Sequence, residues 1–381
     1  MKVLILTAAT GAGHLTAARG LAEAFQAAAP DATVKVFDTC SHPAIRAASA
    51  SYNFFLRRPP RWMNAYYRAV HLSRLPQLGA AVTRRWAKQI LLSESPDLAV
   101  SVHPILNFGI ASTRERHARE VPFAIVLTDP YPPFWKGWAE PRASRTVVPT
   151  ADAAKQLAAW GVPPDRIEVG GMPVPPLFQR SADEESRRAV RASLGLEEGR
   201  FTLLINAGSA GRRTTERVLR RLVAARDLHD RIQIVFVAGR NRPLGIRAAR
   251  LAAPFPKAAL DWCEDMAALL DVADATFTKA GGLSVSEAMA KGVPVLVDAC
   301  EGVLPQESGT AGAIERGRCG WKIHEPEEVV RILRETSAGE WAERRKRALE
   351  SVRGGAASIA QSLLALLRTP VVLPEGAGSL L

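Results

Sequence analysis

The sequence contains few cysteines, and no two of them form a short-spaced pair. Its four cysteines, Cys40, Cys263, Cys300 and Cys319, lie far apart, and no CxxC pair occurs. Zinc sites and disulfide-stapled domains usually carry such pairs or a dense set of cysteines. The cysteine content therefore argues against both, and it predicts a protein of the reducing cytosol.

Long apolar runs and a secretory leader are also missing. No stretch approaches the roughly 18 apolar residues of a membrane span, and the N-terminus lacks a signal-peptide pattern. Met1 and Lys2 are followed at once by the apolar run 3–6, which predicts a buried first strand. With 381 residues, of which 47% are hydrophobic and 23% charged, the composition is that of a soluble globular protein with room for two domains.

Acidic residues are absent from one long segment. Residues 41–93 contain no Asp or Glu, and the whole chain has a formal net charge of +12. The basic residues of the segment are Arg46, Arg57, Arg58, Arg61, Arg68, Arg74, Arg84, Arg85 and Lys88. The same segment holds the aromatic residues Tyr52, Phe54, Phe55, Trp62, Tyr66, Tyr67 and Trp86, and also Met63.

Cations interleaved with aromatic rings suit an anionic membrane surface, where the rings settle at the level of the headgroups. Nucleic acid is the competing polyanion, and a general compositional bias towards Arg is the third interpretation. We favour the membrane surface and expect no nucleic-acid partner.

Short apolar runs alternate with helical patterns along most of the chain. Strands are expected at 2–8, 33–38, 98–102, 123–128, 145–148, 201–206, 233–237, 275–278, 294–297 and 321–323. This alternation is typical of α/β proteins with doubly wound sheets. The second half also predicts a helix at 181–191 and a long helical pattern at 339–367.

A turn-rich break at 170–176 separates two Rossmann-like units, which would face each other across a cleft. We expect a first domain at 1–172, a second at 173–369 and a flexible tail at 370–381.

The most informative motif lies between residues 261 and 310. The strand expected at 275–278 is followed by Gly281 and Gly282, and a helix is expected directly after them. Such a turn aims free backbone N–H groups at a ligand, and the helix dipole favours an anion there. Ser284 stands in the first turn of this helix. Glu287 lies about one turn in, where its carboxylate can accept hydrogen bonds from two vicinal hydroxyls such as those of a ribose.

A second turn of small residues, 206–211, precedes a helix from about Arg213. Gly208, Ser209 and Gly211 could form a phosphate cradle, in which the Ser hydroxyl is an additional donor. Taken alone, this is a common turn of Rossmann-like folds.

The first half has a shorter glycine motif, Gly11-Ala12-Gly13-His14, after its first strand. Glycines at such turns often serve packing alone, but Gly11 and Gly13 would also let a substrate approach the backbone. The ordinary pKa of a histidine, about 6.5, makes His14 suitable for taking a proton from a hydroxyl.

Two further polar residues end strands of the first sheet. His103 is either a structural hydrogen-bonding residue or part of the site. Asp129 at the end of the next strand either points into the cleft or caps the following turn.

This ordered set of motifs resembles the nucleotide-sugar glycosyltransferases of the GT-B fold, over roughly residues 1–350. The most similar branch holds the monogalactosyldiacylglycerol synthases, the processive diacylglycerol glucosyltransferases and the peptidoglycan lipid-intermediate GlcNAc transferase. The resemblance implies two Rossmann-like domains and an enzyme that uses a UDP-sugar as donor substrate, with no cofactor.

The resemblance also assigns residues of the donor side. It implies that Glu287 holds the ribose, and that Gln306 and Glu307, expected on a loop, bind the sugar hydroxyls. The diphosphate would be bound by Gly208, Ser209, Gly211, Gly281 and Gly282. Cys263 and Met266 match a segment that reads the nucleobase, although Met266 could equally be core. Asp265 is expected to cap the helix that starts at Met266.

On the acceptor side, the resemblance implies inverting transfer of a hexose to a lipid hydroxyl, with diacylglycerol as the expected acceptor. His14 is the expected base, and Asp129 either orients it or is itself the base, while His103 faces the acceptor. The sequence departs from the family at Pro133, where a His is expected, and at Thr310, where an Asn is common. No Asp-x-Asp occurs, so the reaction is expected to need no metal.

Three other functions remain open at this point. They are GlcNAc transfer to a polyprenyl-linked peptidoglycan precursor, nucleotide-sugar binding without catalysis, and epimerisation of a nucleotide sugar. The expected location is the cytoplasm, with peripheral association at the inner face of the cell membrane. The partners would be a UDP-sugar, a lipid acceptor and an anionic membrane surface. The sugar, the lipid and the oligomeric state are left undetermined.

Overall fold

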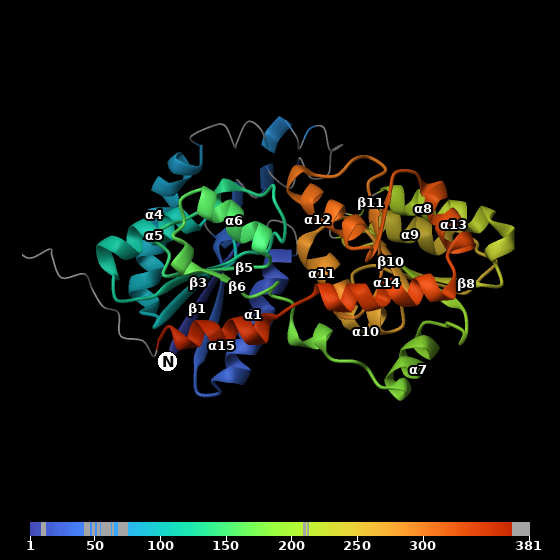
Figure 1. Cartoon of the computed structure of the whole chain (residues 1–381), viewed down its shortest axis with the longest axis horizontal. Coiled ribbons are helices and arrows are strands. Elements are labelled where there is room, and N and C mark those ends of the chain that lie inside the picture. The colour runs from blue at the N-terminus through green and yellow to red at the C-terminus, as the bar shows by residue number, and fades with distance from the viewer. Residues whose placement is uncertain are drawn as a thin grey trace, which may run out of the picture.

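The computed structural model describes residues 1–8, 13–41, 75–208, 211 and 213–367, with isolated positions between 46 and 67. Two lobes lie side by side, one built mainly from the first half of the chain and the other mainly from the second (Figure 1). Each lobe has a six-stranded sheet whose paired strands are parallel, with helices packed around it. The predicted α/β fold with two Rossmann-like units is confirmed.

The sheet of the first lobe has the strand order β2-β1-β3-β4-β5-β6. Its strands are β1 Lys2–Thr7, β2 Thr33–Asp38, β3 Leu98–Ser101, β4 Phe123–Val126, β5 Arg145–Val148 and β6 Ile167–Val169. Its helices in the first half of the chain are α1 Gly13–Ala28, α4 Leu75–Glu94, α5 Asn107–His117 and α6 Ala151–Ala159.

The sheet of the second lobe has the order β12-β11-β10-β7-β8-β9. Its strands are β7 Phe201–Asn206, β8 Ile232–Val237, β9 Lys257–Leu260, β10 Ala275–Thr278, β11 Val295–Asp298 and β12 Gly320–Ile323. The helices are α7 Glu184–Ser193, α8 Arg213–Ala224, α9 Arg242–Arg250, α10 Met266–Asp271, α11 Gly282–Ala290, α12 Pro305–Arg316, α13 Pro326–Glu335 and α14 Ala338–Ser351.

The central strands form where apolar residues run without interruption. Leu4 and Ile5 of β1 are fully buried, and all six residues of β8 are buried, as expected for parallel strands covered on both faces. The ten predicted strands are confirmed to within two residues. The sequence did not predict β6 or β9. Both are half-buried edge strands that carry a charged residue, Glu168 or Lys257, so neither has a continuous apolar run.

The predicted helical stretch 339–367 is two helices, α14 and α15 (Ala356–Ala365), separated by a break. Gly354 in the break has φ +69°, and a Cβ there would lie 2.1 Å from the carbonyl O of Gly170. Gly171, with φ +86°, forms a β-bridge with Gly354. The helix is interrupted because the chain passes directly against the backbone of the interlobe connection.

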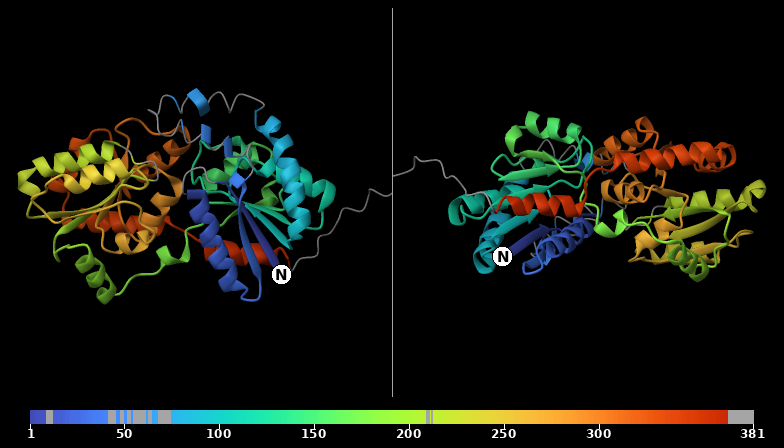
Figure 2. Two further views of the ribbon diagram at one scale, coloured as in Figure 1. Left: turned by 180° about the vertical axis from the view of Figure 1, so that it is seen from behind. Right: turned by 60° about the horizontal axis from the view of Figure 1, so that its bottom comes forward.

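After this break the chain returns to the first lobe. α15 lies along the first lobe beside α1, and not with the second lobe (Figures 1 and 2). Ile359 and Leu363 of α15 are fully buried and share a core with Val3 and Leu21. The expected domain boundary therefore needs a correction, because residues 356–367 complete the first lobe. The expected tail, 370–381, lies outside the described residues.

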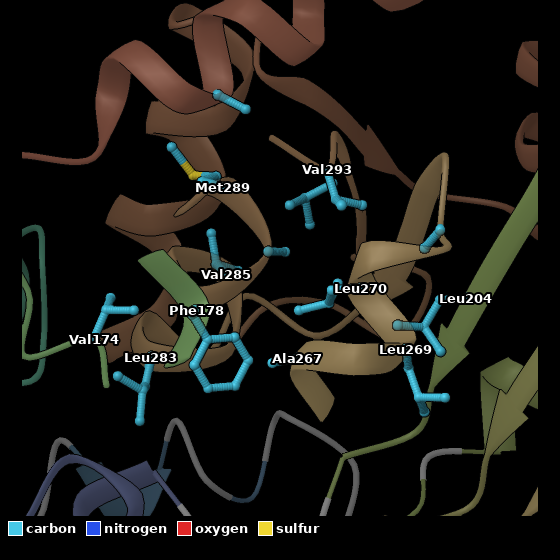
Figure 3. Close-up of a cluster of buried hydrophobic side chains, with 14 of the residues drawn as sticks. Val174, Phe178, Leu204, Ala267, Leu269, Leu270, Leu283, Val285, Met289 and Val293 are labelled. Carbon is cyan, nitrogen blue, oxygen red and sulfur yellow. The ribbon is translucent and has the colours of Figure 1, made fainter. Parts of the chain in front are cut away.

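The two lobes also share a core next to the interlobe connection. Leu283, Val285 and Met289 of α11 belong to one buried cluster with Phe178, which follows the connection, and with α10 residues such as Leu270 (Figure 3). Ala17 of α1 belongs to the same buried cluster. Apolar burial thus fixes α1 of the first lobe against α11 of the second.

The basic and aromatic segment 41–93 is described only in part. Tyr67 and Trp86 are buried, 8% and 7% exposed, so these two rings belong to the core. Phe54 and Trp62 are 53% and 49% exposed. Many of the segment's arginines lie outside the described residues. Among the residues that are described, no helix combines the length and apolarity needed to cross a bilayer.

Candidate functional site

The expected motifs of both lobes meet where the carboxyl ends of the two sheets face each other. α1 starts at Gly13 beyond the end of β1, and α11 starts at Gly282 beyond the end of β10. A Cβ built at Gly13 would lie 3.8 Å from Cβ of Leu283, and one at Gly282 would lie 2.6 Å from the carbonyl O of Thr128. The two helix N-termini therefore lie close together, at the place where doubly wound sheets bind ligands.

His14, the second residue of α1, is fixed through one ring nitrogen. Its Nδ1 lies 2.8 Å from the carbonyl O of Val102 and 2.9 Å from Oγ1 of Thr128. Because a carbonyl oxygen can only accept, we assign the proton to Nδ1, which leaves the lone pair on Nε2. This tautomer is the one that a general base requires.

The pKa of His14 is lowered to about 4, mainly because the ring is buried. The positive charge of Lys279 also lowers this pKa, whereas the hydrogen bond with Val102 partly raises it. The ring is therefore neutral at pH 7. His103 packs against it, with the ring centroids 4.5 Å apart. Burial also holds the pKa of His103 well below its usual value, and its Nδ1 accepts a bond from the N–H of Ile105 at 3.3 Å.

Asp129, just beyond β4, is positioned by an indole. Nε1 of the fully buried Trp138 donates to Oδ2 of Asp129 at 2.7 Å. The pKa of Asp129 is raised to about 6, mainly because the carboxyl is buried. The negative charge of Glu307 also raises this pKa, whereas the hydrogen bond from Trp138 and the positive charge of Lys279 lower it. His14 takes its orientation from Val102 and Thr128 rather than from a hydrogen bond with Asp129, which differs from one of the two expected roles of this carboxylate.

Glu287 lies in the middle of α11 and is 8% exposed. Burial raises the pKa of its carboxyl to about 7. Ser284, one turn earlier on the same helix, is half-buried. A nearly buried carboxyl close to neutrality can change its charge when a ligand supplies hydrogen-bond donors.

The second glycine turn is shaped by two asparagines. Gly208 has φ +69°, and its N–H donates to Oδ1 of Asn206 at 2.9 Å. Gly211 has φ +66°, and a Cβ there would lie 2.3 Å from Cβ of Asn241. The positive φ favours glycine at both positions, and at Gly211 the contact with Asn241 also leaves no room for a side chain. Ser209 and, in the first lobe, Gly11 lie outside the described residues.

Gln306 and Glu307 lie in the first turn of α12, so the expectation of a loop was wrong. Pro305 occupies the first helical position, where its missing N–H costs no hydrogen bond. Both side chains are 6% exposed. Thr310, one turn further, is 2% exposed, and its Oγ1 is buried without a hydrogen-bond partner among the residues that the structure describes.

Sequence reasoning missed Lys279, which lies directly after β10. Its Nζ forms an ion pair with Oε1 of Glu307. A Cβ at Gly281 would lie 3.0 Å from this Nζ, and one at Gly208 would lie 3.8 Å from Cδ and Cε of the same side chain. The lysine thus lies over both glycine turns. In the sequence, the position of Lys279 just before Gly281 and Gly282 could have indicated a role at this turn.

The segment expected to read the nucleobase follows β9. Asp265 caps α10 by accepting from the N–H of Ala268 at 3.0 Å, so this prediction is confirmed. Cys263 and Met266 are half-buried and pack against the second-lobe core. The sequence reasoning did not single out Trp262, which is 45% exposed and carries the guanidinium of Arg240 4.8 Å above its ring.

Pro133, the departure from the family pattern, is exposed. The described part of the chain contains no group of three or more His, Cys, Asp or Glu side chains placed to hold a metal ion. The arrangement as a whole offers a neutral imidazole and a carboxylate on one side, and a lysine with two glycine turns on the other.

The chain is similar to several known proteins in sequence and in fold. A family model described as "Monogalactosyldiacylglycerol (MGDG) synthase" matches residues 14–174. The probable monogalactosyldiacylglycerol synthase of soybean, Glycine max, is 27% identical over 98% of this chain and 73% of its own length. The monogalactosyldiacylglycerol synthase of spinach, Spinacia oleracea, is 27% identical over 87% of this chain, which spans 65% of that relative's length.

Solved structures share the fold at low identity. MurG of Acinetobacter baumannii superposes with a TM-score of 0.60 at 15% identity, covering 97% of this chain and 99% of that one. Anabaena Alr3699/HepE in complex with UDP-glucose gives 0.58 at 16% identity, with the same coverage. UDP-GlcNAc 2-epimerase from Neisseria meningitidis bound to UDP-GlcNAc gives 0.60 at 13% identity, covering 97% and 100%. The chain therefore has the GT-B fold of these solved structures, and its sequence is similar to the monogalactosyldiacylglycerol synthases.

Proposed function

We propose that this protein transfers a hexose from a UDP-sugar to a hydroxyl of a lipid, diacylglycerol being the proposed acceptor, with inversion at the anomeric carbon. The observation that carries the proposal is the contact between the two lobes. It brings the N-terminus of α1, which carries His14, next to the N-terminus of α11, where we expect the donor diphosphate to bind. A base and a diphosphate site at one place suit an attack by a hydroxyl on a nucleotide sugar.

In the proposed mechanism, Nε2 of His14 takes the proton of the acceptor hydroxyl as that oxygen attacks the anomeric carbon. Val102 and Thr128 hold the ring in the tautomer that this step needs. The diphosphate leaves from the opposite face of the sugar. N–H groups at the Gly208 and Gly281 turns stabilise its charge, and no metal is assigned to this step.

The donor would be held by residues of the second lobe. Glu287 would accept hydrogen bonds from the ribose, and Gln306 and Glu307 from the transferred sugar. Trp262 with its neighbouring Arg240 offers an exposed aromatic face beside the segment expected to read the base. The anchoring of these residues on α11, α12 and the loop after β9 supports a common donor site.

We also propose that the protein works in the cytoplasm while bound peripherally to the inner face of the cell membrane. The exposed rings of Phe54 and Trp62, within the acid-free segment 41–93, support this proposal. The lipid acceptor would then reach the first lobe from the bilayer surface.

A panel of UDP-sugars incubated with and without diacylglycerol tests the proposal. We expect UDP release and a glycolipid of the added hexose mass only when both substrates are present. Product with a polyprenyl-linked peptidoglycan precursor instead of diacylglycerol would favour the GlcNAc-transfer alternative. Conversion of the donor without any acceptor would indicate an epimerase, and UDP-sugar binding with no turnover would indicate a binding protein.

A further inference from the structure

The ion pair between Lys279 and Glu307 lies beside the two glycine turns that we expect to bind the donor diphosphate. Lys279 comes from the end of β10 and Glu307 from the first turn of α12. The ammonium lies within 3.0 Å of the Cβ position of Gly281, and the lysine stem is 3.8 Å from the Cβ position of Gly208. A diphosphate bound by both turns would therefore touch the ammonium.

The carboxylate of this pair is only half satisfied. Glu307 is 6% exposed, its Oε1 is bound by Lys279, and its Oε2 is buried with no hydrogen-bond partner in the described part of the chain. Buried acceptors are normally satisfied, and an orphan of this kind points to a missing donor. Sugar hydroxyls would supply such donors, whereas a diphosphate has only acceptors to offer.

We propose that Lys279 exchanges partners during donor binding: its ammonium moves from Glu307 to the donor diphosphate, and Glu307 is released to bind the sugar hydroxyls. This inference rests on the proposed function and assigns Lys279 as a binding residue for the diphosphate. When Lys279 leaves, Glu307 becomes an unpaired buried charge, which is costly, unless sugar hydroxyls take the place of the ammonium beside it. The exchange therefore couples diphosphate binding to sugar recognition.

Calorimetry with UDP, UMP and a UDP-hexose tests the exchange. Lys279→Met should weaken UDP binding about tenfold or more, as expected for loss of a charged contact, and should change UMP binding little, because UMP lacks the second phosphate. Lys279→Arg should retain most of the affinity. Lys322→Met, on β12 two strands along the same sheet, removes the same charge and should leave UDP binding unchanged.

The Glu307→Gln variant separates the exchange from a fixed ion pair. If Lys279 must leave Glu307, this variant should bind UDP as well as or better than the wild type, while its preference for UDP-hexose over UDP falls about tenfold. The double variant, Lys279→Met with Glu307→Gln, should then have the same UDP affinity as Lys279→Met alone. Thermal unfolding of each variant shows that the fold is kept.

Two results would overturn the inference. Equal UDP affinity of wild type and Lys279→Met would show that the lysine does not reach the diphosphate. A loss of UDP affinity in Glu307→Gln as large as that in Lys279→Met would show that the pair acts as one fixed unit. Failure of the wild-type protein to bind any UDP compound would instead refute the proposed function, so the two failures can be distinguished.

Discussion

Single residues at the junction of the lobes differ in the pH at which they change charge. His14 has its pKa lowered to about 4, Asp129 has its pKa raised to about 6, and Glu287 has its pKa raised to about 7. Burial is the main cause in all three, and it favours the neutral form each time. Kinetic and binding measurements as a function of pH can therefore separate the roles of these groups.

The base can be identified from turnover. His14→Ala should lower kcat by about 10²–10⁴-fold with UDP affinity unchanged, because general bases contribute that much and the nucleotide contacts lie in the other lobe. With His14 as the base, Asp129→Asn keeps most of the turnover. The wild-type kcat would then fall only as the pH approaches 4.

The opposite pattern would assign the base to Asp129. In that case His14→Ala would retain nearly full turnover, Asp129→Asn would not, and kcat would fall as the pH drops through about 6. UDP affinity must be measured for both variants together with kcat, so that weaker donor binding is distinguished from a slower chemical step.

Donor affinity should depend on the charge of Glu287. Glu287→Ala should weaken UDP binding about tenfold or more, because a charged hydrogen-bond partner of the ribose is lost. In the wild type, affinity should fall as the pH drops below about 7, where the carboxyl becomes protonated. Calorimetry at several pH values checks both; unchanged UDP affinity in the variant would disprove the assignment of Glu287.

Glu287 should also cost the fold stability at high pH. Its pKa is about 7 in the folded protein against 4.5 ordinarily, so the folded state binds this proton more tightly than the unfolded state. The contribution of this group to the free energy of unfolding is therefore fully present below pH 4.5 and is lost as the pH rises through 7. The loss amounts to at most about 3 kcal/mol. Glu287→Gln should therefore be the more stable protein at pH 8, with little difference near pH 4 in chemical unfolding.

Among the elements, α15 contributes to the first lobe from the far end of the chain. Ile359 and Leu363 are fully buried against residues of β1 and α1. Ile359→Ala should lower the free energy of unfolding by about 2–5 kcal/mol, as cavities in packed cores do. Gln361→Ala, an exposed position on the same helix, should change it little. Equal effects of the two changes in urea unfolding would contradict the packing of α15.

The elements also show what the sequence could predict. Central strands such as β1 and β8 were predictable because their apolar runs are local patterns, and the helix after Gly281 and Gly282 was predictable from the turn. The edge strands β6 and β9 lack such runs. The contact of Thr128 with His14 spans 114 positions, and that of Lys279 with Glu307 spans 28. No local pattern records contacts of this kind, so they appeared only in the structure.

For the whole molecule, the basic segment 41–93 predicts electrostatic binding to an anionic membrane surface. Binding to anionic vesicles should weaken with salt, since screening at about 0.15 M acts within roughly 8 Å. Reversing Arg57, Arg58 and Arg61 to Glu should release the protein in vesicle sedimentation while UDP binding remains. The structure of these three residues is outside the described range, so the prediction rests on the sequence.

The control for this experiment reverses three exposed arginines of the second lobe, Arg217, Arg226 and Arg250, which changes the net charge by the same amount. This variant should still sediment with anionic vesicles. Equal sedimentation of all variants with neutral and anionic vesicles would mean that the acid-free segment takes no part in docking.

The return of the chain to the first lobe has a consequence for biosynthesis. A ribosome releases the strands and helices of the first lobe first, but α15, which covers part of its core, emerges only after the whole second lobe has been made. Domains generally fold as units during synthesis, N-terminal first. Here the lobe that is made first is completed last, and its apolar surface over β1 and α1 stays open until then. A nascent chain stalled before Ala356 would be expected to carry a folded second lobe beside an unfinished first one.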